Sequence, residues 1–181
     1  SLLAHGETSL GVLGTVSITT LLDAYGRLAI EVANREHLLV GDTESWLRFA
    51  QNVLFDHESV ARAIYAHIAS STDDGEGGGE ALVKLVRSLA KNDLEPIVMI
   101  LYSQNRLGSV DAALTDDVAI RMAAFSLREN RFDLAAMFNA HIRSPPGGMS
   151  ELEWLLRRAR TEVFAGNASV GTRILVDHLR L

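Results

Sequence analysis

The stretch Ile97-Val-Met-Ile-Leu-Tyr102 decides the fold, because it is the longest uninterrupted apolar run in this 181-residue chain. A helix that crosses a bilayer needs ~20 apolar residues, so the run is far too short, and we expect any membrane contact to be peripheral. Pro96, directly before the run, is tolerated in the first turn of a helix. The stretch therefore predicts a helix that is buried on every side, at the centre of the main core.

Outside this run, apolar residues recur at helical spacing, and sustained two-residue alternation is hard to find. We therefore expect an all-α fold. The expected helices cover roughly residues 18–32, 43–54, 60–68, 82–89, 97–102, 117–129, 132–142, 150–164 and 168–179. Asp56 is the expected cap of the third helix. Ser150-x-x-Glu153 is a capping box that begins the eighth helix, and Gly166-Asn167 ends it.

Two segments predict breaks between helices. Residues 70–80 read Ser-Ser-Thr-Asp-Asp-Gly-Glu-Gly-Gly-Gly-Glu, and this mixture of glycine and acidic side chains predicts a flexible acidic loop. Ser144-Pro-Pro-Gly-Gly148 is a second break, because neither proline nor paired glycine fits the interior of a helix cheaply.

Charge is distributed unevenly along the chain, whose net charge is −6. Residues 1–130 contain ten Lys or Arg and eighteen Asp or Glu, a net charge of −8, whereas residues 131–181 contain seven and five, a net charge of +2. Only Lys84 and Lys91 are lysine, so most positive charge is guanidinium, which pairs bidentately with carboxylate and phosphate.

Motifs for catalysis and metal binding are missing from the sequence. Zero cysteines exclude disulfides, thiolate metal sites and a Cys nucleophile. The six histidines form no i, i+3 or i, i+4 pair, and neither a nucleophile elbow nor a phosphate-binding loop occurs. We therefore expect no enzyme activity, no metal and no cofactor. His57 and His67 are candidate pH sensors, since imidazole charges between neutral and endosomal pH.

The helix expected over residues 150–164 carries the candidate contact site. Its apolar face is expected to comprise Leu152, Leu155, Leu156, Ala159 and Val163. Arg157, Arg158 and Arg160 fan over the remainder, with Trp154 beside the first two. An indole between guanidinium groups predicts contact with anionic lipid headgroups or RNA, or self-association. Alternatively, Trp154 packs against the amino-terminal domain and the arginines pair with its carboxylates.

Two segments carry a resemblance to a known family. Arg48-Phe-Ala-Gln-Asn52 and Leu101-Tyr-Ser-Gln-Asn-Arg-Leu-Gly108 resemble, in order and spacing, two landmarks of the matrix proteins of orthomyxoviruses. The residues that carry the resemblance are Arg48, Phe49, Gln51, Asn52, Tyr102, Asn105, Arg106 and Gly108. The basic segment of that family has no counterpart here, because Arg62 is the one basic residue between Val60 and Ser71.

The resemblance implies a helical-bundle amino-terminal domain, residues 1–130, and a small three-helix carboxyl-terminal domain, residues 131–181. It implies a viral matrix structural protein that forms a layer under the virion envelope and bridges lipid membrane and ribonucleoprotein. The implied partners are further copies of the chain, an anionic membrane bound peripherally, and viral ribonucleoprotein or RNA itself. The uneven charge of the two ends predicts that the copies stack head to tail. The implied locations are the inner face of the virion envelope and the host cytoplasm and nucleus. The sequence agrees in lacking a secretory leader before the first expected helix.

A repeat architecture is the alternative. Helix pairs are expected to begin near Thr43, Glu80, Thr115 and Ser150, at intervals of 37, 35 and 35 residues, within the range of helical-repeat solenoids. This reading predicts a protein–protein interaction adaptor. Compact bundles joined near Asn130 would favour the matrix interpretation, and a regular superhelical stack would favour the adaptor. A dedicated RNA-binding module is disfavoured by the net charge of −6.

Overall fold

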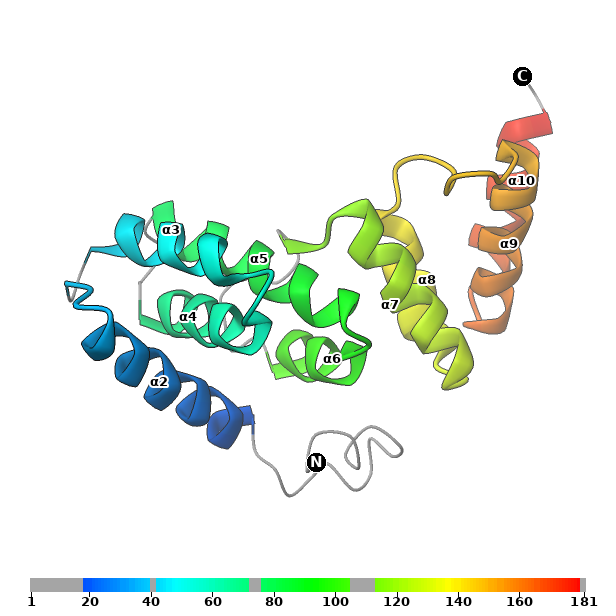
Figure 1. Cartoon of the computed structure of the whole chain (residues 1–181). Helices are drawn as coiled ribbons and strands as arrows, with labels where there is room; N and C mark the ends of the chain where they lie inside the picture. Colours follow the sequence, from blue (N-terminus) through cyan, green and yellow to red (C-terminus); the bar gives the residue numbers. More distant parts are fainter. Residues whose placement is uncertain (1–17, 40–41, 72–75, 105–112, 180–181) are drawn as a thin grey trace. The chain divides into compact units, whose positions relative to one another are not determined.

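The structure, a computed structural model, describes residues 18–39, 42–71, 76–104 and 113–179 (Figure 1). The all-α expectation is confirmed: these residues form helices and contain no strand. The helices are α2 Ile18–Arg35, α3 Thr43–Val53, α4 Glu58–Ser71, α5 Glu76–Lys91, α6 Glu95–Gln104, α7 Asp116–Arg128, α8 Phe132–His141, α9 Glu151–Phe164 and α10 Ala168–Leu179. None of the helices in these ranges has the length and apolarity that crossing a bilayer requires.

The chain divides into two compact units between Ala113 and Leu114. The boundary expected near Asn130 is therefore wrong, since α7 packs against α8 and belongs to the second unit. Asn130 instead ends α7 in a left-handed conformation, with φ 57°, and forms the tight turn into α8. The second unit thus has four helices in its described part, not the three expected for the carboxyl-terminal domain.

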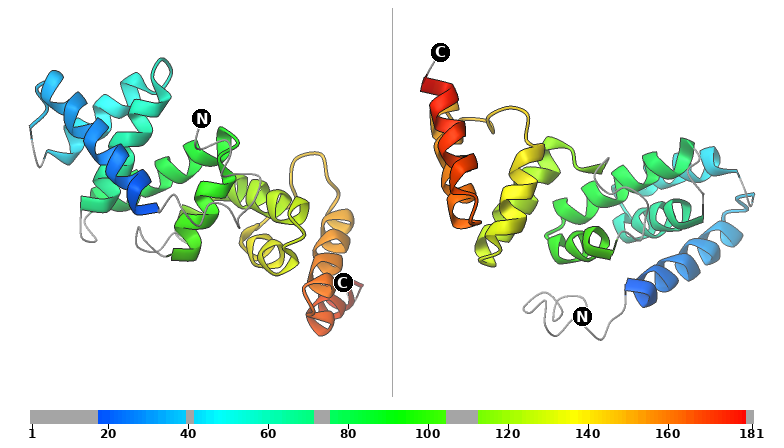
Figure 2. Two further views of the ribbon diagram at one scale, coloured as in Figure 1. Left: turned by 90° about the horizontal axis from the view of Figure 1, so that it is seen from below. Right: turned by 180° about the vertical axis from the view of Figure 1, so that it is seen from behind.

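The first unit is built around α4, which packs against α2, α3 and α5 (Figure 2). Ala63, Ile64, Tyr65 and Ala66 are consecutive and all buried, so α4 is covered on every side. The expectation that the Ile97–Tyr102 run forms the centre of the core is wrong. The run is helical and largely buried in α6, with Pro96 in the first turn, but α6 packs mainly against α5.

The second unit consists of two helix hairpins, α7–α8 and α9–α10, with α8 packed against α9 (Figure 2). The first helices of the hairpins begin at Asp116 and Glu151, 35 residues apart, as the repeat reading predicts. Earlier in the chain, α3 and α5 begin at Thr43 and Glu76, so the intervals to α5 and α7 are 33 and 40. The expected interval therefore occurs once, between the two hairpins of the second unit.

Local sequence signals place the ends of α9 as expected. The Ser150 hydroxyl accepts a hydrogen bond from the Glu153 N–H at 3.2 Å, which caps the helix. At the other end Gly166 has φ 88°, and the Asn167 N–H donates to the Glu162 carbonyl at 2.8 Å. This is the Schellman arrangement, in which glycine adopts the left-handed conformation without steric cost.

Two local expectations are wrong. Asp56 does not cap α4, because the helix begins at Glu58 and the carbonyl of His57 accepts a hydrogen bond from the Ala61 N–H.

The break expected over residues 70–80 is shorter than predicted, since α4 continues to Ser71 and α5 begins at Glu76. Gly77 lies in the first turn of α5 so close to the Thr43 side chain that a Cβ would overlap it. The absence of a side chain at Gly77 thus permits this close approach. Residues 72–75 lie outside the described ranges.

Two helical glycines give a matched stability test. A Cβ at Gly171 in α10 would lie 2.7 Å from the Ala159 carbonyl oxygen of α9, whereas a Cβ at Gly79 in α5 would meet nothing within 4 Å. Gly79→Ala should raise the free energy of unfolding by roughly 0.5–1 kcal/mol, because alanine has the higher helix propensity. Gly171→Ala should destabilise by roughly 1–3 kcal/mol, because overpacking outweighs propensity. Urea denaturation followed by circular dichroism measures both, and equal stabilisation would contradict the close α9–α10 contact.

Candidate interaction surface

Trp154 determines how α9 lies in the second unit. Its side chain is 9% exposed and packs with Ala119 of α7 and with Ile142. The prediction that Trp154 lies on a polar outer face is therefore wrong. It is wrong because α8 and α10 both pack against α9 in such a way that the buried face is rotated from the apolar stripe and includes Thr161. Trp154 packs within its own unit.

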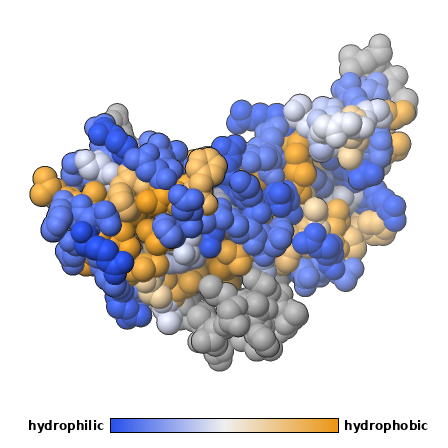
Figure 3. All heavy atoms as spheres, in the orientation of Figure 1, coloured by the Kyte–Doolittle hydropathy of each residue, from blue (hydrophilic) through white to orange (hydrophobic). Residues whose placement is uncertain are grey.

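The opposite face of α9 leaves apolar side chains exposed. Leu152, Leu156 and Val163, which the apolar periodicity assigns to the core, are each about half exposed, and so is Phe164. Among the expected core residues of this helix, Ala159 is buried and Leu155 partly buried. In the space-filling view, apolar side chains reach the surface over both units (Figure 3). Exposed apolar side chains gathered on one helix face mark a candidate contact surface.

A groove lies beside this face, entirely within the second unit, and we call it the second-unit groove. Its volume is about 450 Å³, and it is lined by Leu127, Phe132, Arg157, Arg160, Thr161 and Phe164. The rings of Phe132 and Phe164 are 5.2 Å apart between centroids, at an interplanar angle of 35°. The groove therefore combines aromatic surface with two guanidinium groups.

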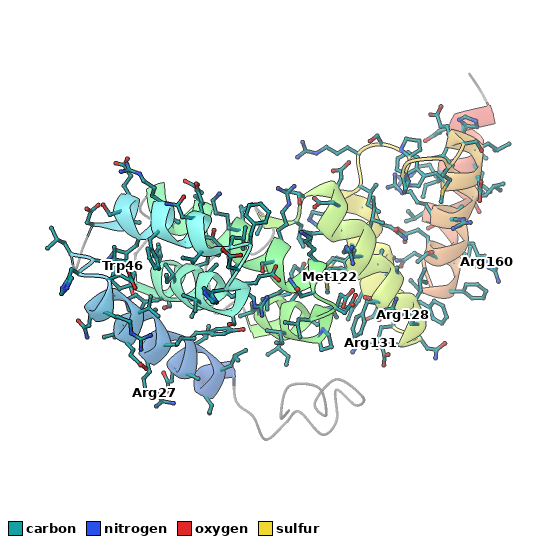
Figure 4. All side chains as sticks on the ribbon, viewed as in Figure 1. Arg27, Trp46, Met122, Arg128, Arg131 and Arg160 are labelled. Carbon is teal, nitrogen blue, oxygen red and sulfur yellow. The ribbon has the colours of Figure 1, made fainter. Side chains whose placement is uncertain are left out.

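The two groove arginines are held by weak interactions. Arg157 pairs with Glu153 at 2.8 Å, and both side chains are exposed, so the pair contributes only ~0.3–0.5 kcal/mol. Arg160 forms no ion pair with any described residue; its guanidinium carbon lies 5.3 Å from the centroid of the Phe164 ring. Figure 4 labels Arg160 on α9, with Arg128 and Arg131 at the turn between α7 and α8. A ligand can therefore bind both guanidinium groups of the groove with only a small loss of free energy from these existing interactions.

Arg158 plays a different part from its neighbours. Its guanidinium carbon lies 4.8 Å from the centroid of the Trp154 ring, so it covers the buried indole. Burial lowers the pKa of Arg158 from its usual value, and the charge of Glu162 opposes that shift. Of the three arginines predicted to form one site, the structure brings Arg157 and Arg160 together in the groove and assigns Arg158 to packing.

The residues that resemble the matrix family lie in the first unit. Arg48, Gln51 and Asn52 are exposed on α3, and Phe49 is partly buried. Arg48 pairs with Glu44 one turn earlier at 2.6 Å. Tyr102 is partly buried in α6. Asn105, Arg106 and Gly108 lie outside the described residues.

The two candidate pH sensors have unlike surroundings. His57 is exposed, directly before α4. His67 lies on α4 and stacks on Trp46 of α3, with ring centroids 5.2 Å apart. It also lines a groove between α2 and α4 together with Asp23 and Arg27. Burial lowers the pKa of His67 from its usual value of 6.5.

The sequence did not identify the aromatic part of the second-unit groove. Phe132 begins α8 and Phe164 ends α9, so neither belongs to an apolar stripe. Only the packing of the hairpins brings the two rings together.

No protein-family model matches the chain, and no curated protein or solved structure matches it significantly. Within the described ranges, no three His, Asp or Glu side chains are grouped as a metal site would need.

His67 makes the stability of the first unit depend on pH. Because its pKa is lower in the folded chain than the value of 6.5 expected when unfolded, protonation favours unfolding. The contribution of the neutral His67 side chain to the free energy of unfolding is fully present above pH 6.5. It should be lost as the pH falls through the lower pKa of the folded chain. Thermal unfolding between neutral pH and pH 5 should show this loss. His67→Phe keeps an aromatic ring against Trp46 and should reduce the pH dependence; His57→Gln, which removes an exposed imidazole, is the comparison variant. An unaltered pH dependence in His67→Phe would refute the assignment.

Proposed function

We propose that the chain is a non-enzymatic interaction scaffold of the helical-repeat type, whose second unit binds another polypeptide. The observation that carries the proposal is the pair of hairpins α7–α8 and α9–α10, which begin 35 residues apart and pack in chain order. In such stacks each hairpin packs on its sequence neighbours, which leaves outer faces available for binding.

The surface chemistry of the second unit supports a polypeptide ligand. Phe132 and Phe164 offer aromatic surface that can bury an apolar side chain, and aromatic and Arg residues are enriched at the centres of protein interfaces. Arg157 and Arg160 offer planar forks that bind carboxylates bidentately. The matching ligand carries a large apolar side chain next to an acidic one.

Selection from a random peptide library displayed on phage, against the immobilised full chain, tests this proposal. Enriched peptides should carry Asp or Glu next to Phe, Leu or Ile. In fluorescence anisotropy, replacing Arg157 and Arg160 together by Ala should weaken their binding by roughly ten-fold or more. The control is Arg173→Ala, which removes an exposed arginine of α10. Enriched peptides without carboxylates, or equal binding by the double variant, would contradict the proposal.

A second candidate is a matrix-type structural protein, and the opposite charges of the two units favour it. Residues 1–113 contain eight Lys or Arg and fifteen Asp or Glu, a net charge of −7. Residues 114–181 contain nine and eight, a net charge of +1, with every basic residue an arginine. We propose in this case a layer of head-to-tail copies under the virion envelope that joins anionic lipid to viral ribonucleoprotein or RNA, with host cytoplasm and nucleus as further locations.

Flotation with vesicles separates the two candidates. A matrix-type protein should float with vesicles containing phosphatidylserine and not with neutral vesicles, and the floating fraction should fall as salt screens the charges. Replacing Arg157, Arg158 and Arg160 together by Ala should abolish flotation. Because Arg158 covers Trp154, the Arg157→Ala, Arg160→Ala double variant serves as the comparison with intact packing. Absence of flotation by the unmodified chain would remove the lipid-binding part of this candidate.

A further inference from the structure

Phe55 is the most exposed large apolar side chain in the described residues, at 93%. It lies in the turn between α3 and α4. This turn is fixed by its backbone, because the N–H groups of Asp56 and His57 both donate to the Val53 carbonyl, at 3.2 and 2.7 Å. Because the ring is almost fully exposed on an ordered turn, a partner that covers it gains the apolar burial of a whole phenyl group.

The residue next to Phe55 gives this contact a charge. Asp56 is exposed and forms no ion pair with any residue that the structure describes. It lies in the unit whose net charge is −7. Phe55 and Asp56 together therefore present an aromatic side chain beside a free carboxylate, and we call this pair the Phe55 turn.

We propose that the Phe55 turn of one copy docks in the second-unit groove of another copy. This inference rests on the proposed function and identifies the bound polypeptide as a second copy of the chain. The phenyl ring of Phe55 packs against Phe132 and Phe164, in the second-unit groove of about 450 Å³. The carboxylate of Asp56 pairs with Arg160, which has no ion-pair partner in the described part of the chain.

Complementarity of two surfaces on the same chain selects a second copy over other ligands. The groove needs an apolar group and a carboxylate together, and the Phe55 turn supplies both. A phosphate group by itself would engage Arg157 and Arg160, yet it would leave the apolar lining of Leu127, Phe132 and Phe164 without a partner.

The contact joins unlike surfaces, so a pair of bound copies still has one free turn and one free groove. Such heterologous association continues into open chains or closes into rings. A single turn in a single groove is a small interface, and small interfaces belong to the weak, transient class. Association should therefore rise gradually with protein concentration and weaken with salt.

Sedimentation velocity of the full chain over a range of concentrations tests this proposal. The mean sedimentation coefficient should rise with concentration at low salt and less at high salt. Phe55→Ala and Arg160→Glu should each weaken association at least ten-fold. Phe55→Ala removes a solvent-exposed side chain, so the fold should persist, and circular dichroism verifies this. The control is Leu39→Ala, which truncates another apolar side chain of the first unit, 71% exposed, and should leave association unchanged.

Mixing the variants provides the decisive measurement. Phe55→Ala keeps an intact groove and Arg160→Glu keeps an intact turn, so their mixture should form a one-to-one dimer and nothing larger. In a single chain, Asp56→Arg combined with Arg160→Glu should restore association by exchanging the charges.

A chain that stays monomeric at all concentrations overturns the proposal, and so does association that Phe55→Ala leaves unchanged. If the chain is monomeric but carboxylate-bearing peptides still bind the groove, the self-docking fails and the proposed function stands. If these peptides also fail to bind, both fail.

Discussion

The rest of the second unit depends on the burial of Trp154, because this side chain fixes the rotation of α9 about its axis. Successive residues advance by 100° around a helix, so an inward Trp154 places Leu152, Leu156 and Val163 outward. The indole Nε1 is buried without a hydrogen-bond partner in the described structure, which costs ~1–3 kcal/mol. Burying the indole surface, on the order of 150–250 Å², contributes about 4–6 kcal/mol and outweighs that cost.

The ends of helices were predictable from the sequence, because hydrogen bonds between residues close in the chain determine them. Ser150 and Gly166 mark the ends of α9, because the interactions that cap a helix involve residues within one turn. The core of the first unit was not predictable in this way. It forms around α4, where Ala63 and Ala66 allow neighbouring helices to approach closely, although alanine contributes little to an apolar pattern.

The domain boundary and the candidate site were missed because both depend on tertiary packing. The polar residues around Asn130 predict the end of a helix correctly, but a tight hairpin turn and a linker between domains have similar compositions. The apolar pattern of α9 indicates one buried stripe, whereas packing against two neighbouring helices buries a face that is rotated from this stripe. Leu156 and Trp154 consequently lie on the faces opposite to those expected. Arg157 and Arg160 were identified because charge at a helix surface is visible in sequence, while Phe132 and Phe164 meet only through the fold.

Packing and accessible positive charge are separated on α9 within a few residues. Arg158 covers the indole that anchors the helix, so replacing it removes packing as well as charge. Arg157 and Arg160 are held by an exposed ion pair and by a ring contact at the surface, so a ligand carboxylate can recruit them without opening the core. Cation–π contacts at exposed sites contribute only about 0.5–1 kcal/mol, which a bidentate carboxylate can replace or accompany. This arrangement gives the groove a positive charge that is available to a ligand, on a helix whose position is fixed by other side chains.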